Sequence, residues 1–216
     1  MLPFSRGAFL DVFEVYNEAV WPAQPIAWLL GLAALAALVR PETRIQRLAL
    51  WVMAAMWLWT GVAYHWLFFS EINPAAILFG LLFIAQGGLL ATLALRGHPR
   101  FRFGWRAGPA EVLGAALIGY AGIVYPLIDL ALGHWPRMPA FGISPCPVTL
   151  YTLGLLLLAR PRPPGWLWAV PVAWSLIGGT AAFLLGIVQD WVLLASGPLA
   201  LLVAFLPRGR TAERYR

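Results

Sequence analysis

The stretch Phe141-Gly-Ile-Ser-Pro-Cys-Pro-Val-Thr149 holds the only cysteine of the 216-residue chain and places Cys146 between two prolines at the start of an apolar segment. That segment ends at Ala159, which is short for a membrane span of about 20 residues. Irregular backbone at membrane depth is tolerated only where protein or a cavity surrounds it. We therefore expect part of residues 141–147 to lie at membrane depth as the broken entrance of a helix.

The composition indicates which solvent surrounds the rest of the chain. It is 61% hydrophobic and 11% charged, with a mean hydropathy of +0.77, whereas soluble domains have about 25% charged residues. Lipid offers the backbone no hydrogen-bond partner, so membrane spans are helices or closed barrels, and the long apolar runs lack the alternation of barrel strands. The predicted fold class is all-α, a polytopic membrane helical bundle.

The apolar runs predict about seven transmembrane helices in a single domain that covers residues 1–216. We expect them at about residues 22–39, 48–69, 74–95, 109–133, 144–159, 166–185 and 191–206. Residues 3–20 form an amphipathic helix, because apolar side chains recur at helical spacing opposite Asp11, Glu14 and Glu18. We expect this helix to lie along a membrane surface or to pack across the mouth of the bundle.

The distribution of basic residues predicts an orientation. All fifteen are arginines, and thirteen of them lie in the loops after the first, third and fifth spans and in the basic tail 207–216, against Arg6 and Arg137 on the other side. The positive-inside rule then predicts a bacterial inner-membrane protein with its C-terminus in the cytoplasm and its N-terminus outside. The net charge of +6 forms no basic face, so it does not indicate nucleic acid, and the absence of lysine excludes retinal as a cofactor.

Side chains that can bind an ion or a solute gather in the predicted outer half. The candidates for a solute or metal site are His65, Glu71, Asn73, Tyr125, Asp129, Cys146 and Thr149. Ionisable groups at membrane depth usually line a cavity or pair with each other, and a thiolate is a soft metal ligand, so Cys146 and His65 are the candidate metal ligands. The alternative is structural. Asp129 would then lie at the surface, His65 would bond a carbonyl, and Cys146 would be a small buried residue.

Five stretches carry a recognisable signature. They are Tyr64-His65, Phe68-Phe69, Ile72-Asn-Pro-Ala-Ala76, Phe141-Gly-Ile-Ser-Pro-Cys-Pro147 and Trp174-Ser-Leu-Ile-Gly-Gly179. Together with Leu2-Pro-Phe4 and Tyr16-Asn17 they resemble a bacterial multi-pass integral membrane family known only as a domain of unknown function. The resemblance covers nearly the whole chain. It implies a bacterial inner-membrane protein with several spans and assigns no activity or cofactor.

We expect a protein that binds or transports a small solute or a metal ion through an outward-facing polar pocket, with the lipid bilayer around it. A membrane-embedded enzyme or redox protein that uses the same pocket is the alternative, and a sensor or assembly partner that docks through residues 3–20 is the third. A transporter needs a polar path to both faces, and the inner half offers few polar groups besides Gln86 and Tyr120. A pocket that is closed at its floor would therefore favour binding or catalysis.

Overall fold

The computed structural model describes residues 2–40, 42–96, 102–103 and 108–205. The predicted basic tail at 207–216 lies outside the described residues. Apart from two strands of two residues each, β1 (Arg102–Phe103) and β2 (Ala159–Arg160), which pair antiparallel, the regular structure of these residues is helical. The predicted all-α fold class is confirmed for this part of the chain.

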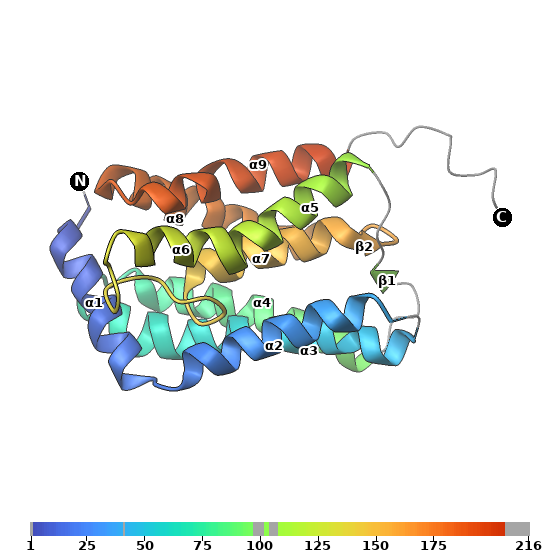
Figure 1. Ribbon diagram of the computed structural model, residues 1–216, viewed down its shortest axis with the longest axis horizontal. Coiled ribbons are helices and arrows are strands. Elements are labelled where there is room, and N and C mark those ends of the chain that lie inside the picture. The colour runs from blue at the N-terminus through green and yellow to red at the C-terminus, as the bar shows by residue number, and fades with distance from the viewer. Residues whose placement is uncertain (1, 41, 97–101, 104–107, 206–216) are drawn as a thin grey trace.

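The helices lie side by side, and the chain passes from one end of the bundle to the other along them (Figure 1). In chain order they are α2 (Ala23–Leu38), α3 (Thr43–Trp59) continued by η1 (Thr60–Phe68) and η2 (Phe69–Glu71), α4 (Ala76–Arg96), α5 (Pro109–Gly119) continued by η3 (Tyr120–Val124) and α6 (Tyr125–Ala131), α7 (Pro145–Leu158), α8 (Ala169–Leu185) preceded by η4 (Gly165–Trp168), and α9 (Trp191–Phe205) preceded by η5 (Val188–Asp190). Helix α1 (Arg6–Ala19) instead crosses one end, which we call the α1 end. Strands β1 and β2 lie at the opposite end, the β end (Figure 1).

Within the described residues, five helical stretches are long and apolar enough to cross a membrane. They are Arg44–Glu71, Ala76–Arg96, Pro109–Ala131, Gly165–Leu185 and Val188–Phe205. Helix α2 has 16 residues and meets α1 at an angle of 85°, and α7 has 14 residues. At 1.5 Å per residue α7 is about 21 Å long, compared with about 30 Å for the hydrocarbon core. The number of spans supported by length alone is therefore five, or six if the bent pair of α1 and α2 is one span.

Helix α7 lies in the centre of the bundle. All of its 14 residues are buried, and it contacts α3, α5, α8 and α9. Its backbone approaches α5 closely, because a Cβ atom on Gly154 would lie 2.7 Å from the carbonyl oxygen of Gly114. A helix that is apolar all round is expected at such a buried position. Because its neighbours surround it, α7 does not have to match the thickness of the lipid itself.

Helix α1 packs across the mouth of the bundle, which is one of the two positions expected for residues 3–20. Its N-terminus is capped by Ser5, whose Oγ accepts a hydrogen bond from the amide of Ala8 at 3.2 Å. Its apolar face is buried against the α1 end. There the ring of Phe13 stacks on Tyr64 with centroids 5.1 Å apart, and the Tyr16 hydroxyl donates to the carbonyl oxygen of Ile143 at 2.8 Å.

Two helix starts differ from the hydropathy boundaries. Helix α3 begins at Thr43 rather than near residue 48, because arginine and glutamine are good helix formers and extend the helix beyond its apolar part. Helix α4 begins at Ala76 rather than at residue 74. The side chain of Asn73 accepts a hydrogen bond from the amide of Ala75 at 3.2 Å, and this turn holds Pro74 outside the helix.

Two π-helical segments interrupt the spans. Segment η1 has nine residues and η3 has five, and both lie in the half of the bundle near the α1 end (Figure 1). The sequence predicts an interruption at Pro126, and η3 ends two residues before it, since the missing amide of a proline removes an intrahelical hydrogen bond. A π-turn widens the helix and redirects its side chains, and such turns are frequent at functional sites. Both π-helical segments therefore point to the half near the α1 end as the place of a candidate site.

Candidate functional site

A pocket of about 400 Å³ lies in the half of the bundle near the α1 end. Its lining residues are Leu2, Phe4, Phe9, Tyr64, Phe69, Asn73, Phe79, Pro145, Cys146, Trp174, Leu176, Ile177, Gly178, Thr180, Ala181, Ala182, Leu184 and Asp190. Most of these side chains are aromatic or aliphatic, and the polar ones are few. A volume of this size and a mainly apolar wall with a few polar groups are typical of small-molecule sites.

Three buried polar groups of the pocket wall have no hydrogen-bond partner among the described residues. They are the hydroxyl of Tyr64, the indole nitrogen of Trp174 and Oδ2 of Asp190. The thiol of Cys146 lies beside the Asp190 carboxylate and the Trp174 indole, within range of both. Buried polar groups in proteins are nearly always paired, so each exception requires an explanation. Among the described residues, the thiol is within reach of Asp190 and Trp174, and the Tyr64 hydroxyl has no partner at all. A ligand in the pocket would supply the remaining bonds.

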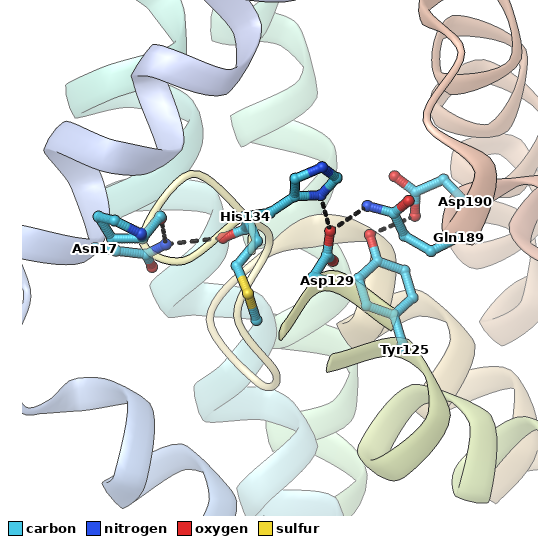
Figure 2. Close-up of polar contacts among 8 residues, drawn as sticks. Asn17, Tyr125, Asp129, His134, Gln189 and Asp190 are labelled. Carbon is cyan, nitrogen blue, oxygen red and sulfur yellow. Dashed lines mark hydrogen bonds and ion pairs between the residues drawn. The ribbon is translucent and has the colours of Figure 1, made fainter. Parts of the chain in front are cut away.

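The backbone after α8 delivers Asp190 to the pocket. Gly186 ends α8 in a left-handed conformation with φ of 69°, which a glycine adopts without steric cost. The chain then turns back, and η5 places Asp190 with no exposed surface. Its Oδ1 accepts a hydrogen bond of 2.7 Å from the Tyr125 hydroxyl of α6 (Figure 2). This bond fixes the carboxylate and leaves Oδ2 for the pocket.

A second carboxylate, Asp129, belongs to the same network but does not line the pocket. Its Oδ1 accepts a hydrogen bond of 2.7 Å from the Gln189 side chain and lies 2.9 Å from Nδ1 of His134 (Figure 2). Asp129 is buried, whereas the His134 side chain is 29% exposed. The network therefore runs from the outside of the α1 end inward to the segment that carries Asp190.

His65 lies behind the pocket wall and inside an aromatic cage. Its ring centroid is 4.7 Å from that of Phe83, 5.0 Å from Trp174 and 5.3 Å from Tyr64. It has no exposed surface, and neither of its nitrogens has a hydrogen-bond partner among the described residues. The carbonyl bond considered as its structural role is therefore not among its contacts. His65 adds a further unpaired polar group to this half of the bundle.

The proline-flanked cysteine opens α7 as the sequence predicts. Pro145 is in the first turn of the helix, where a missing amide costs no hydrogen bond, and Ser144 accepts one from the amide of Ala140 at 2.8 Å to shape the entrance. The Thr149 hydroxyl donates to the carbonyl oxygen of Pro145 at 2.8 Å, so it is satisfied within its own helix.

The structure gives less support to metal binding than to the binding of a small molecule. Across the residues that the structure describes, no group of three or more His, Cys, Asp or Glu side chains is arranged to hold a metal ion. Structural metal sites for soft ions usually use more than two protein ligands. A site built on Cys146 and His65 remains a prediction that requires ligands from another source.

The structure places some of the predicted site residues in the pocket wall and others away from it. Cys146 and Asn73 line the pocket, whereas Glu71 is exposed at the end of η2. Sequence reasoning did not select Asp190, because an acidic residue between two apolar spans looks like a loop residue. The short distance from Gly186 to the start of α9 is the signal that could have identified it, since five residues leave little room for an exposed loop.

No curated protein and no solved structure matches the chain. A family profile described as "Family of unknown function (DUF6064)" matches residues 6–216, which is nearly the whole length. The match includes the buried carboxylates, all of the helices described above and all of the pocket lining except Leu2 and Phe4. The chain therefore belongs to the DUF6064 family of unknown function.

Proposed function

We propose that this DUF6064 protein is an inner-membrane protein that binds a small molecule in the pocket near its α1 end. The observation that carries the proposal is the unpaired Tyr64 hydroxyl, together with polar atoms of Trp174 and Asp190 that have only the Cys146 thiol within range, in an otherwise apolar wall. An unsatisfied buried polar group costs about 1–3 kcal/mol. A ligand that pairs with these groups removes that cost, and the apolar wall binds the rest of the molecule.

The closed floor of the pocket favours binding over transport. All of the lining residues lie in the half near the α1 end, and between the pocket and the β end stand the buried leucines Leu153 and Leu155–Leu158 of α7. Gln86 is one of the few polar groups nearby: its amide nitrogen donates to the carbonyl oxygen of Leu167 at 3.1 Å, and its Oε1 has no partner among the described residues. A conducting path would require polar groups that continue through this region.

We also propose seven spans, with α2 and α7 crossing the bilayer together with the five longer stretches. In this topology the connections after α2, α4 and α7 meet at the β end (Figure 1), and they carry most of the loop arginines. The positive-inside rule assigns that end to the cytoplasm and the pocket to the outer half.

The orientation is tested with two cysteine variants in a Cys146→Ser background. Glu18→Cys and Glu42→Cys both place a thiol at an exposed position, the first near the α1 end and the second between α2 and α3. A membrane-impermeant maleimide added to intact spheroplasts should label Glu18→Cys at once and Glu42→Cys only after permeabilisation. The reverse order would contradict the proposed topology.

Access to the pocket is tested with the thiol of Cys146, the only cysteine of the chain. Folded wild-type protein should react with N-ethylmaleimide at alkaline pH, where more of the thiol is ionised, because the pocket gives the reagent access to it. Ala181→Trp, which fills the pocket from α8, should slow the reaction about tenfold or more, since reactivity requires access to the thiol. Leu202→Trp, at an exposed position of α9, is the matched control and should leave the rate unchanged. Equal rates in Ala181→Trp and wild type would reject the pocket as a binding site.

A further inference from the structure

The pocket borders the surface that faces lipid. Its lining residues Leu176, Ile177 and Leu184 on α8 are 44%, 43% and 65% exposed. They belong to a stretch that is long and apolar enough to cross a membrane, so their exposed atoms face hydrocarbon when α8 spans the bilayer. Phe79 of α4 also lines the pocket, and its ring contacts that of Trp174 on α8 with centroids 5.3 Å apart, nearer the start of α8 than these three residues. A molecule dissolved in the membrane can therefore reach the pocket sideways, between α4 and α8.

The side toward water is covered by aromatic residues. Phe4, which precedes α1, packs its ring on Phe9 and on Phe69, with centroids 5.8 Å and 5.4 Å apart. Phe9 and Phe69 also contact each other at 5.9 Å, and all three line the pocket. These contacts close the pocket beneath α1. A solute from the aqueous phase would have to separate these three rings, whereas a solute from lipid could enter past Ile177 and Leu184, which lie closer to the C-terminal end of α8 than the contact between Phe79 and Trp174.

The deep wall has hydrogen-bonding groups of both kinds. The Tyr64 hydroxyl and the Trp174 indole each have a hydrogen to donate, and Oδ2 of Asp190 accepts. A hydroxyl group on a ligand both donates and accepts, so it can pair with Asp190 and with one of the two donors at the same time. A hydrocarbon without a polar group would form no hydrogen bond with any of these three groups. A strongly hydrated ion would have to lose its bound water to enter a mainly apolar pocket, which is costly.

We propose that the ligand is an uncharged amphiphile dissolved in the membrane, an apolar chain with a hydroxyl group, which enters between α4 and α8 and places the hydroxyl between Asp190 and Tyr64. This inference rests on the proposed function, because it specifies what the pocket binds. The chain of the ligand lies against α8 and Phe79, and its hydroxyl reaches the deep wall beside Cys146.

The test uses protection of Cys146 against N-ethylmaleimide in protein reconstituted into lipid nanodiscs. The probes are 1-dodecanol, dodecane, which has the chain alone, and glycerol, which has hydroxyl groups without the chain. We expect 1-dodecanol to slow the reaction about fivefold or more and the other two to change it less than about twofold, because only the alcohol satisfies both parts of the site. Equal protection by dodecane would show that the hydroxyl is not recognised, and equal protection by glycerol would show access from water. Either result overturns the inference.

Three variants test which side chains bind the hydroxyl group of 1-dodecanol. Tyr64→Phe removes one hydroxyl and keeps the ring that stacks on Phe13, so it should raise the concentration of 1-dodecanol needed for half protection about threefold or more. Asp190→Asn replaces the free acceptor and should act in the same direction. Tyr151→Phe is the control, since the Tyr151 hydroxyl donates to Gly31 outside the pocket, and it should leave protection unchanged.

The outcomes also separate this inference from the proposed function. If Cys146 reacts in the folded protein but no alcohol protects it, the pocket is accessible and the proposed ligand class is wrong. If protection is unchanged in both Tyr64→Phe and Asp190→Asn, the hydroxyl does not bind at the deep wall and the inference fails. If Ala181→Trp, which fills the pocket, reacts as fast as the wild type and no probe changes the rate, the pocket does not control access to Cys146 and the proposed function itself fails.

Discussion

The two halves of this bundle differ in how closely they pack and in how many buried polar atoms lack a partner, although the Trp168 indole nitrogen near the β end also has none among the described residues. Near the β end, Glu111 pairs with Arg160, and the backbones of α5 and α7 touch at Gly114 and Gly154. Near the α1 end, two helices widen into π-turns, a pocket opens, and several buried polar atoms have no partner among the described residues. Closely packed, paired interiors supply stability, whereas functional sites tolerate unsatisfied groups. The difference is the one expected if the β end contributes most of the stability and the α1 end binds the ligand that we propose.

The largest expected effect on stability is a substitution at the contact of α5 and α7. Gly114→Ala would place a Cβ atom 2.8 Å from the carbonyl oxygen of Gly154, so the two backbones must separate, which costs about 3 kcal/mol. Gly119→Ala on the same helix meets no atom within 4 Å and should be neutral or stabilising by about 0.5–1 kcal/mol. Denaturation of both variants in detergent measures the contrast. Similar stabilities would show that the β end is not closely packed.

The ion pair near the β end should have the next largest effect. Glu111→Gln removes the charge that faces Arg160, and we expect a loss of about 2 kcal/mol, because a hydrogen bond between charged groups contributes about 1.5–3 kcal/mol. Glu42→Gln, at an exposed position, is the control and should change stability by less than about 0.5 kcal/mol. Equal thermal stability of the two variants would show that the ion pair between Glu111 and Arg160 does not stabilise the fold.

The smallest effect is expected at the α1 end, although the residue is fully buried. His65→Leu replaces a side chain whose two nitrogens have no partner among the described residues with an apolar one of similar size. No hydrogen bond is lost, so stability should change by no more than about 1 kcal/mol in either direction. A loss as large as that of Gly114→Ala, measured in the same detergent, would mean that His65 has a structural role.

Hydropathy could predict the helices because lipid forces every backbone group of a span into an intrahelical bond. It placed α2, α7 and α9 within a residue or two of their ends, and the amphipathic pattern identified the face of α1 that carries Phe13 and Tyr16. It could not place the start of α3, because hydropathy records the lipid boundary and a helix can extend beyond it into polar residues. Helix length does not fix the number of spans either, because α7 is surrounded by other helices and can be shorter than the lipid is thick.

The site could be predicted only in part. Cys146 and Asn73 were identified by residue type and by their position next to prolines, and both line the pocket. Asp190 was not identified, because its burial depends on the left-handed turn at Gly186 and on the hydroxyl of Tyr125, which is 65 residues away in the sequence. The position of η3 could be expected from Pro126, whereas η1 and the unpaired atoms depend on packing between segments that are distant in the sequence, which the local hydrophobic pattern does not record.

The difference between the halves is tested most directly along α7, which passes through both. Cys146 and Leu155 are both buried on this helix, the first at the pocket and the second among the leucines near the β end. In folded protein, N-ethylmaleimide should modify Cys146 of the wild type at least about tenfold faster than the thiol of Leu155→Cys in a Cys146→Ser background, because only the first adjoins a cavity. Equal rates, or faster modification at position 155, would contradict a ligand pocket confined to the α1 end.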